Sequence, residues 1–135
     1  MTDTTPAEKH IFVVDDSVEY LNFMQLLLTA EGFRADTACT TDALRDLLRA
    51  GRPDLVISDV RMPGHEAFAV LELLNGEDGW RGIPVLLCTG ALQEVQAQAQ
   101  RLKRDGLDVL FKPFDIDDLI ARVHRLCGVD QAHIQ

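Results

Sequence analysis

The sequence predicts an α/β domain in which helices cover both faces of a five-stranded parallel sheet. Short apolar segments rich in β-branched residues alternate five times with longer segments whose apolar residues recur every three or four positions. Such alternation is typical of β-α units, whose strands run parallel and are buried on both faces. Because crossovers between parallel strands are right-handed, few topologies remain open.

Five segments are predicted to be strands because they are short, apolar and bounded by turn residues. The first, His10-Ile-Phe-Val-Val-Asp15, has the strongest β-branched character, and the second is the most polar. The predicted strands cover residues 10–15, 33–38, 54–58, 83–88 and 106–111.

The segments between the strands carry helix start and stop signals. Ser17 is expected to cap the first helix and Gly32 to end it. Thr41 is expected to cap the second helix, and Asp115 the last one, which runs to about Cys127. The third and fourth helices are expected over about 66–74 and 92–104.

The chain has 135 residues, which is enough for one domain with a core of its own and too few for two. We expect that domain over residues 10–127, after a polar segment at 1–9 and before a tail at 128–135. No apolar run has the length of a membrane span, and the first ten residues lack the apolar stretch of a signal peptide. A cytoplasmic location is therefore expected.

The charge balance is acidic, with 13 Lys and Arg against 22 Asp and Glu and a formal net charge of −9. It disfavours direct binding to nucleic acid, which needs clustered cations, and binding to anionic membrane surfaces. Three cysteines, Cys39, Cys88 and Cys127, cannot all pair with one another and have no metal-ligand spacing. They are expected to be reduced thiols.

Polar residues stand at the ends of four of the five predicted strands. Asp15 and Asp16 end the first, and Asp59 follows the third. Thr89 follows the fourth and Lys112 the fifth. Ligands of open α/β sheets bind outside the carboxyl ends of the strands, so these side chains are expected to meet there.

Three carboxylates and one ammonium at this edge carry a net charge of −2, which a divalent cation would neutralise. Oxygen ligands without His or Cys favour Mg²⁺, and a hydroxyl and an ammonium beside it suit phosphoryl oxygens. The combination indicates phosphoryl transfer to a carboxylate. Taken singly, each residue has a simpler interpretation, because an acid after a strand often caps a helix and a lysine often lies on the surface.

Four motifs in order resemble the receiver domain of bacterial two-component response regulators. They are Val13-Val-Asp-Asp16, Asp59-Val-Arg-Met-Pro-Gly64, Ile83-Pro-Val-Leu-Leu-Cys-Thr89 and Phe111-Lys-Pro-Phe114. The resemblance covers about residues 10–127, and although each motif alone is weak, the four at these spacings are specific. It implies a flavodoxin-like fold with strand order 2-1-3-4-5.

The resemblance also assigns roles to individual residues. It implies that Asp59 is the phosphoacceptor and that Thr89 and Lys112 bind the phosphoryl group. It further implies that Mg²⁺ is held by Asp15, Asp16, Asp59 and the backbone carbonyl of Arg61. A cis peptide bond is implied between Lys112 and Pro113.

The function implied is that of a signalling module in a two-component system or phosphorelay. The donor would be a phosphohistidine on a histidine kinase or phosphotransfer protein, and the module would change its partner surface and remove its own phosphoryl group. It would act as a phosphoacceptor and not as an enzyme on other substrates. An output protein or domain, or a second copy, would bind the surface of the fourth helix, fifth strand and fifth helix.

Three other functions stay open at this point. A Mg²⁺-dependent aspartyl-phosphate phosphatase is disfavoured because its second acid would stand two residues after a first-strand nucleophile, where Ser17 follows Asp15 and Asp16. A flavin carrier of similar fold is disfavoured because Asp16 would repel phosphate. A degenerate receiver that serves only as a scaffold is disfavoured by the complete acidic set.

The sequence departs from the family at one informative position. Receiver domains usually carry an aromatic residue three positions before the lysine, which rotates inward on phosphorylation, and here that position is Val109. Signalling through a rotating ring is therefore not expected. His10, His124 and His133 are expected to be solvated, and Trp80 is expected in a loop before the fourth strand.

Overall fold

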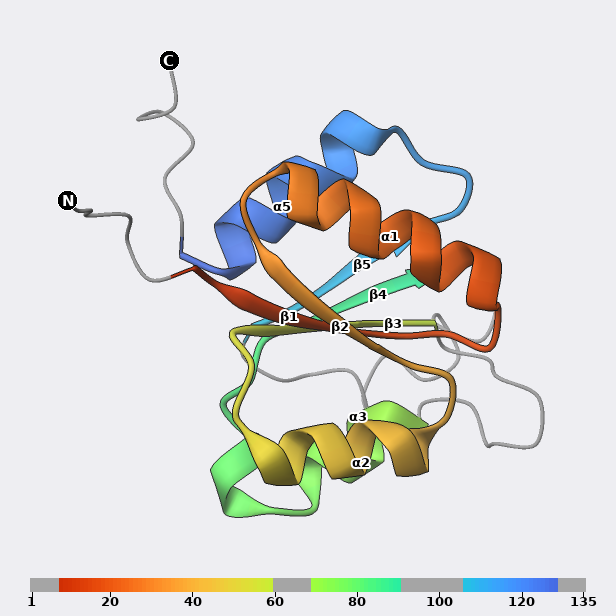
Figure 1. The fold of residues 1–135 in the computed structure, drawn as a ribbon. Coiled ribbons are helices and arrows are strands. Elements are labelled where there is room, and N and C mark those ends of the chain that lie inside the picture. The colour runs from red at the N-terminus through yellow and green to blue at the C-terminus, as the bar shows by residue number, and fades with distance from the viewer. Residues whose placement is uncertain (1–7, 60–68, 91–105, 129–135) are drawn as a thin grey trace, which may run out of the picture.

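A five-stranded parallel sheet forms the middle layer of the protein (Figure 1). The computed structural model describes residues 8–59, 69–90 and 106–128. The strand order is β2-β1-β3-β4-β5, as predicted. The strands are β1 (His10–Val14), β2 (Arg34–Ala38), β3 (Leu55–Ser58), β4 (Val85–Thr89) and β5 (Leu107–Phe111).

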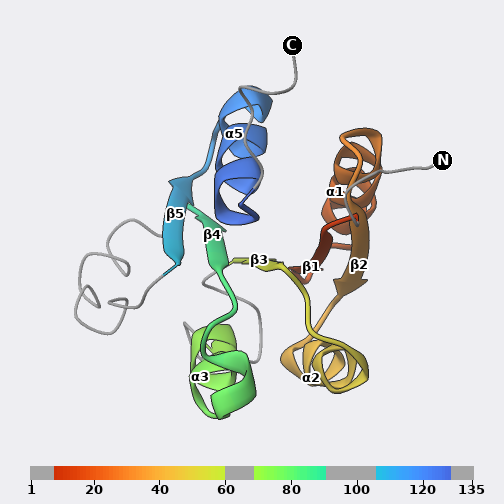
Figure 2. The ribbon, with the colours of Figure 1, turned by 90° about the vertical axis from the view of Figure 1, so that its left-hand side faces the viewer.

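Helices cover both faces of the sheet, which Figure 2 shows edge-on. Helices α1 (Val18–Ala30) and α5 (Ile116–Leu126) lie on one face. Helices α2 (Thr41–Ala50) and α3 (Ala69–Asn75) lie on the other, where the 3-10 helix η1 (Asp78–Trp80) follows α3. The beginning of the expected third helix and the whole of the expected fourth helix lie outside the described residues.

The apolar core consists of two clusters that the sheet separates. Ile11 and Val13 of β1 face the layer of α1 and α5, whereas Phe12 and Val14 face the layer of α2 and α3. Successive strand side chains point to opposite faces, so a strand buried on both sides must be apolar throughout. This explains why the β1 sequence shows an unbroken apolar run.

The helix caps follow the sequence signals with one correction. The Ser17 hydroxyl accepts a hydrogen bond from the backbone N–H of Tyr20 at 3.2 Å and caps α1, as predicted. The second helix is capped by Thr40 and not by Thr41, because the Thr40 Oγ1 accepts from the backbone N–H of Ala43 at 3.0 Å. Thr41 instead begins the helix with its side chain buried.

At the last helix, Asp115 occupies the N-cap position but its side chain makes no capping hydrogen bond to the described residues. Gly32 ends α1 with a φ of 95°, a left-handed conformation that residues with a side chain rarely adopt. Strand β4 begins two residues later than expected and includes Thr89, so this threonine lies within the sheet. No helix in the described ranges is long and apolar enough to cross a membrane.

The expectation for His124 was wrong, because this residue is buried with 5% of its surface exposed. Its ring lies 5.2 Å from the ring of Phe33. In α5, His124 is four residues after Ile120 and next to Val123, both buried, so helical periodicity turns it toward the core. His10 is partly exposed and its Nε2 lies 2.6 Å from Asp36 Oδ2, while His133 is outside the described residues.

Candidate functional site

The register of the sheet brings the predicted site residues to one edge. In the parallel pair of β1 and β3, Val14 lies opposite Ser58, so the next residues, Asp15 and Asp59, leave the sheet side by side. Thr89, at the end of β4, lies opposite the last residue of β5, and Lys112 follows directly. The structure thus brings together four residues that the sequence places in separate motifs.

Asp15 is the buried acid of this site, with 4% of its surface exposed. Its Oδ1 accepts a hydrogen bond from the backbone N–H of Ser17 at 3.0 Å. Burial raises the pKa of Asp15 above its ordinary value of 3.8, and the neighbouring Asp16 and Asp59 raise it further. The Ser17 N–H and the charge of Lys112 act in the opposite direction without reversing the shift.

Lys112, which follows β5, contacts both Asp15 and Asp59. Its Nζ lies 3.2 Å from Asp59 Oδ2 and 3.8 Å from Asp15 Oδ2. Its backbone N–H donates to the carbonyl oxygen of Thr89 at 2.8 Å, which fixes the start of the following loop against β4. The peptide bond between Lys112 and Pro113 is cis, as predicted.

The donor set of this site suits a hard divalent cation. All the acidic side chains of this site are carboxylates, and a bound cation would favour the ionised form of Asp15, whose pKa is raised by burial and further by the neighbouring Asp16 and Asp59. Asp16 is exposed, and Arg61 lies outside the described residues. Among the residues with described positions, no three His, Cys, Asp or Glu side chains form a ready-made metal cluster.

Thr89 and Ser58 are the buried hydroxyl residues at this edge, each with 1% of its surface exposed. The Ser58 hydroxyl donates to the backbone carbonyl oxygen of Asp59 at 2.8 Å. This bond holds the backbone at the end of β3, where Asp59 leaves the sheet. The arrangement presents the Asp59 carboxylate beside an ammonium, a geometry that suits a reaction in which Asp59 acts as a nucleophile.

Sequence reasoning missed Tyr20, which lies beside the site on α1. The Nζ of Lys112 is 4.8 Å from the centre of the Tyr20 ring. Burial raises the pKa of Tyr20, and the nearby Cys88, Asp15 and Asp59 raise it further, so the phenol remains neutral. The available signal was its place three residues after the capping Ser17, in the first turn of the helix that follows Asp15 and Asp16.

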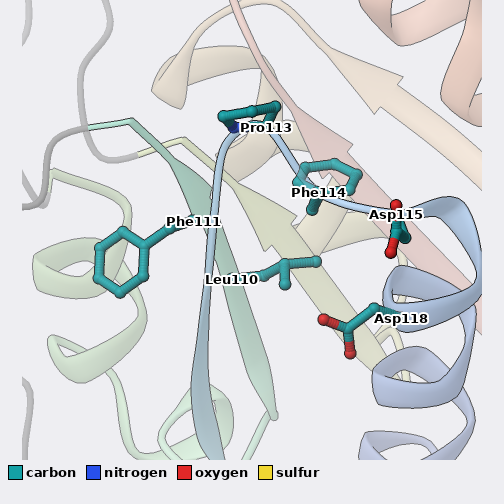
Figure 3. A pocket seen from close by; sticks show the side chains of 6 residues that line it. All are labelled: Leu110, Phe111, Pro113, Phe114, Asp115 and Asp118. Atoms are coloured by element: carbon teal, nitrogen blue, oxygen red, sulfur yellow. The ribbon is translucent and has the colours of Figure 1, made fainter.

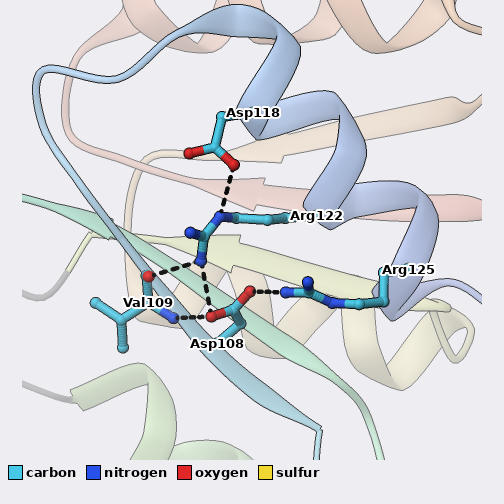
Figure 4. Close-up of polar contacts among 5 residues, drawn as sticks. All are labelled: Asp108, Val109, Asp118, Arg122 and Arg125. Atoms are coloured by element: carbon cyan, nitrogen blue, oxygen red, sulfur yellow. Dashed lines mark hydrogen bonds and ion pairs between the residues drawn. The ribbon is translucent and has the colours of Figure 1, made fainter.

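A network of charged side chains ties α5 to β5 (Figure 4). Asp108 accepts from Arg122 Nη1 at 2.9 Å and also contacts Arg125. Arg122 donates further to Asp118 Oδ1 at 3.0 Å and to the Val109 carbonyl oxygen at 3.1 Å. The hydrogen bond that Arg122 donates to Asp118 is the largest cause of the raised pKa of Arg122. The network fixes the strand that immediately precedes Lys112.

Val109, which stands where the family usually has an aromatic residue, is partly buried against the core cluster on the α2 and α3 side. Its backbone N–H donates to Asp108 Oδ1 at 2.8 Å. With its carbonyl oxygen bound by Arg122, both polar backbone groups of Val109 are held toward the α5 network. No ring is present at this position to rotate.

A shallow hollow of about 340 Å³ lies next to the site between β5 and the start of α5 (Figure 3). The Phe111 ring is exposed at one side of it, and Asp115 and Asp118 stand on the α5 side. Its lining residues are Leu110, Phe111, Pro113, Phe114, Asp115 and Asp118. The hollow therefore combines an apolar floor with an acidic rim.

We predict that Asp15→Asn stabilises the fold, because it removes a desolvated charge and keeps an oxygen that accepts from the Ser17 N–H. The melting temperature at pH 7 should rise by a few degrees, which corresponds to about 1 kcal/mol for a domain of this size. A raised pKa means that ionisation of Asp15 opposes folding, so the gain should be small below pH 3.8, grow as the pH rises from 3.8 to the raised pKa, and stay constant above it.

The exposed Asp46 of α2 provides the matched control, because Asp46→Asn removes the same charge from the surface. Thermal unfolding of both variants between pH 4 and pH 8 measures the difference. Equal melting temperatures for Asp15→Asn and the unmodified protein across this range would contradict the assigned cost of burying Asp15.

Known proteins are similar to this chain in sequence. The chain is 35% identical over 116 residues to the response regulator PleD of Caulobacter vibrioides, a match that covers 86% of this chain and 25% of that protein. It is 32% identical over 117 residues to the DNA-binding response regulator MtrA of Mycobacterium tuberculosis, covering 85% and 49%. The chain thus spans between a quarter and a half of the length of these relatives.

Solved structures give the same result for the fold. The signal receiver domain of a signal transduction histidine kinase from Syntrophus aciditrophicus superposes with a TM-score of 0.78 at 29% identity, covering 89% of this chain and 90% of that one. The chemotaxis response regulator CheY4 of Vibrio cholerae shares the fold with a TM-score of 0.76 at 23% identity, covering 89% and 99%. The model of the response regulator receiver domain matches residues 11–124, and the chain therefore belongs to this family.

Proposed function

We propose that this receiver domain takes a phosphoryl group onto Asp59 from a phosphohistidine on a histidine kinase or phosphotransfer protein. The observation that carries the proposal is the position of the Lys112 ammonium, 3.2 Å from Asp59 Oδ2 and 3.8 Å from Asp15 Oδ2. A cation at this place would offset the charge that develops on the phosphoryl oxygens as they approach a carboxylate.

In the proposed reaction an Asp59 carboxylate oxygen attacks phosphorus, and the bond from phosphorus to the donor's imidazole nitrogen breaks. The imidazole keeps the electron pair of that bond, and Asp59 becomes an acyl phosphate. Lys112 and the Thr89 hydroxyl are proposed to bind the transferred oxygens. Later attack of water on phosphorus restores the carboxylate and releases inorganic phosphate.

Mg²⁺ is the proposed cofactor, held by Asp15, Asp16, Asp59 and the backbone carbonyl of Arg61. When bound, it would supply charge neutralisation for the acids and for the phosphoryl oxygens. The fit rests on the all-oxygen donor set and on the presence of three acidic side chains beside one ammonium. Asp16 is exposed, so it can turn toward a cation without breaking a packed contact.

The proposed role is that of a signalling switch whose chemistry is confined to its own carboxylate. PleD and MtrA are response regulators. Both are longer than this chain, and the match covers only part of each of them. The partner of the phosphorylated state is proposed to bind beside β5 and α5, where the acidic-rimmed hollow lies. That partner would be an output protein or domain, or a second copy of the chain.

We predict that acetyl phosphate with Mg²⁺ adds one phosphoryl group to the protein and that Asp59→Asn abolishes the addition. The amide cannot act as the nucleophile, although its size preserves the packing at the end of β3. Intact-mass measurement counts the added groups directly.

Asp46→Asn is the matched control, because Asp46 is an exposed carboxylate of α2 and is not one of the site residues. This variant should still gain one group. An unchanged mass of the unmodified protein with small-molecule donors and with kinases would favour a scaffold that does not undergo phosphorylation.

We also predict that millimolar Mg²⁺ raises the melting temperature by relieving repulsion among Asp15, Asp16 and Asp59, since binding to the folded state alone stabilises it. Asp16→Ala should reduce this rise and slow phosphorylation in parallel, while Asp46→Ala leaves both unchanged. Titration with Mg²⁺ by calorimetry provides the affinities. A melting temperature indifferent to Mg²⁺, together with normal phosphorylation of Asp16→Ala, would show that the acids need no cation.

Trp80 is predicted to be insensitive to events at the site. It is buried in η1, before β4, whereas Asp59 and Thr89 lie at the carboxyl ends of the strands. A strand of ordinary length separates the two edges by roughly 15–20 Å. Mg²⁺ should therefore leave Trp80 fluorescence nearly unchanged, while amide signals over residues 89–104 shift. Strong quenching of Trp80 with those amides unaffected would exclude this signal route.

A further inference from the structure

We infer that Tyr20 is a positioning residue whose ring holds the Lys112 ammonium in place between Asp15 and Asp59. The inference rests on the proposed function and concerns how quickly this site accepts a phosphoryl group. It assigns to α1 a part in the site that the strand-end motifs do not include.

The Lys112 side chain needs more restraint than its two carboxylate partners give. A third of the side chain is exposed, and its ammonium ends a flexible four-carbon stem. Ordering such a stem costs conformational entropy. The two ion pairs, at 3.2 and 3.8 Å, are made with the acids that follow β1 and β3.

The Tyr20 ring supplies a restraint from a third element. The Nζ of Lys112 lies 4.8 Å from the ring centre, within the range in which a cation is attracted to an aromatic face. The ring is itself held, because it packs against the core cluster that contains Cys88. Because packing fixes the Tyr20 ring, the contact restricts the movement of the Lys112 ammonium.

Hydrogen bonds at the start of α1 link the ring to the same acid that Lys112 contacts. The Ser17 N–H donates to Asp15 Oδ1 at 3.0 Å, and the Ser17 hydroxyl accepts from the Tyr20 N–H at 3.2 Å. Lys112 also contacts Asp15, so Asp15, Ser17, Tyr20 and Lys112 form a closed ring of contacts. The position of Tyr20 relative to Asp15 is therefore determined locally, by the cap.

The ring, and not the hydroxyl, carries this role. The Tyr20 hydroxyl oxygen is buried, and the polar group beside it is the Cys88 thiol, which is a weak hydrogen-bond partner. Removal of the hydroxyl is therefore expected to change the stability of the fold little. Tyr20→Phe therefore separates the ring from the hydroxyl, whereas Tyr20→Leu removes the aromatic face and keeps an apolar side chain.

The test compares the rate of phosphorylation by acetyl phosphate at fixed Mg²⁺ in the full chain. Tyr20→Leu should be about three- to tenfold slower, the range that loss of an ordinary cation–π contact gives. Tyr20→Phe should keep the rate of the unmodified protein. Phe23→Leu, an exposed aromatic residue on the same helix, is the matched control and should also keep the rate.

A second readout follows Lys112 directly and does not depend on phosphorylation. The Lys112 ε-methylene protons should show an upfield ring-current shift by NMR in the unmodified protein and in Tyr20→Phe, and should lose it in Tyr20→Leu. Absence of phosphorylation in the unmodified protein would refute the proposed function, while this shift would still test the placement of Lys112.

Three results would overturn the inference. Tyr20→Leu could react at the unmodified rate, or Tyr20→Phe could be as slow as Tyr20→Leu, which would assign the effect to the hydroxyl. A slow Tyr20→Leu whose Lys112 protons keep their shift would show that the loss does not act through the ammonium.

Discussion

Like charges collected at one edge of a parallel sheet impose the constraint on which the rest of this site depends. The turn from β1 into α1 places Asp15 beside Asp16, and the register of β1 with β3 adds Asp59. Burial raises the pKa of Asp15, and the neighbouring Asp16 and Asp59 raise it further. The fold must therefore deliver a cation to this edge, and Lys112 is the one that the chain itself provides.

The placement of Lys112 explains several features that otherwise look unrelated. The charged network of Asp108, Arg122 and Arg125 fixes β5 against α5 just before the lysine. The backbone bond to Thr89 then fixes the start of the loop after it. Each contact restricts the backbone on one side of Lys112, so the remaining freedom lies in its side chain. In this arrangement a nearby aromatic ring can restrict the position of the ammonium.

We expect signalling in this domain to differ from the aromatic route that is usual in its family. Val109 offers no ring, and the backbone around it is bound by the α5 network. Thr89, in contrast, lies at the very end of β4, beside the site, and is followed in the chain by Gly90. We therefore expect phosphorylation to act by displacing Thr89 and the Gly90 backbone. Packed layers transmit such small shifts because interiors have few voids.

Most of the fold could be predicted from the sequence because it depends on local periodicity. Unbroken apolar runs such as that of β1 indicate strands buried on both faces, and alternation with amphipathic segments indicates the parallel sheet. The strand ends then located Asp15, Asp59, Thr89 and Lys112, because parallel strands share one carboxyl edge. Boundaries were less accurate, since Thr40 and Thr41 are adjacent and both are suitable caps.

The sequence by itself determined the order of the elements and the edge at which the charged residues meet. Only the tertiary structure decided how each side chain is used there. It set the ring of the buried His124 beside that of Phe33, and it brought the Tyr20 ring to Lys112 from the far end of the chain. Such contacts join residues that are distant in sequence, and no spacing encodes them. They arise because the packing of all the core side chains together determines where each helix lies over the sheet.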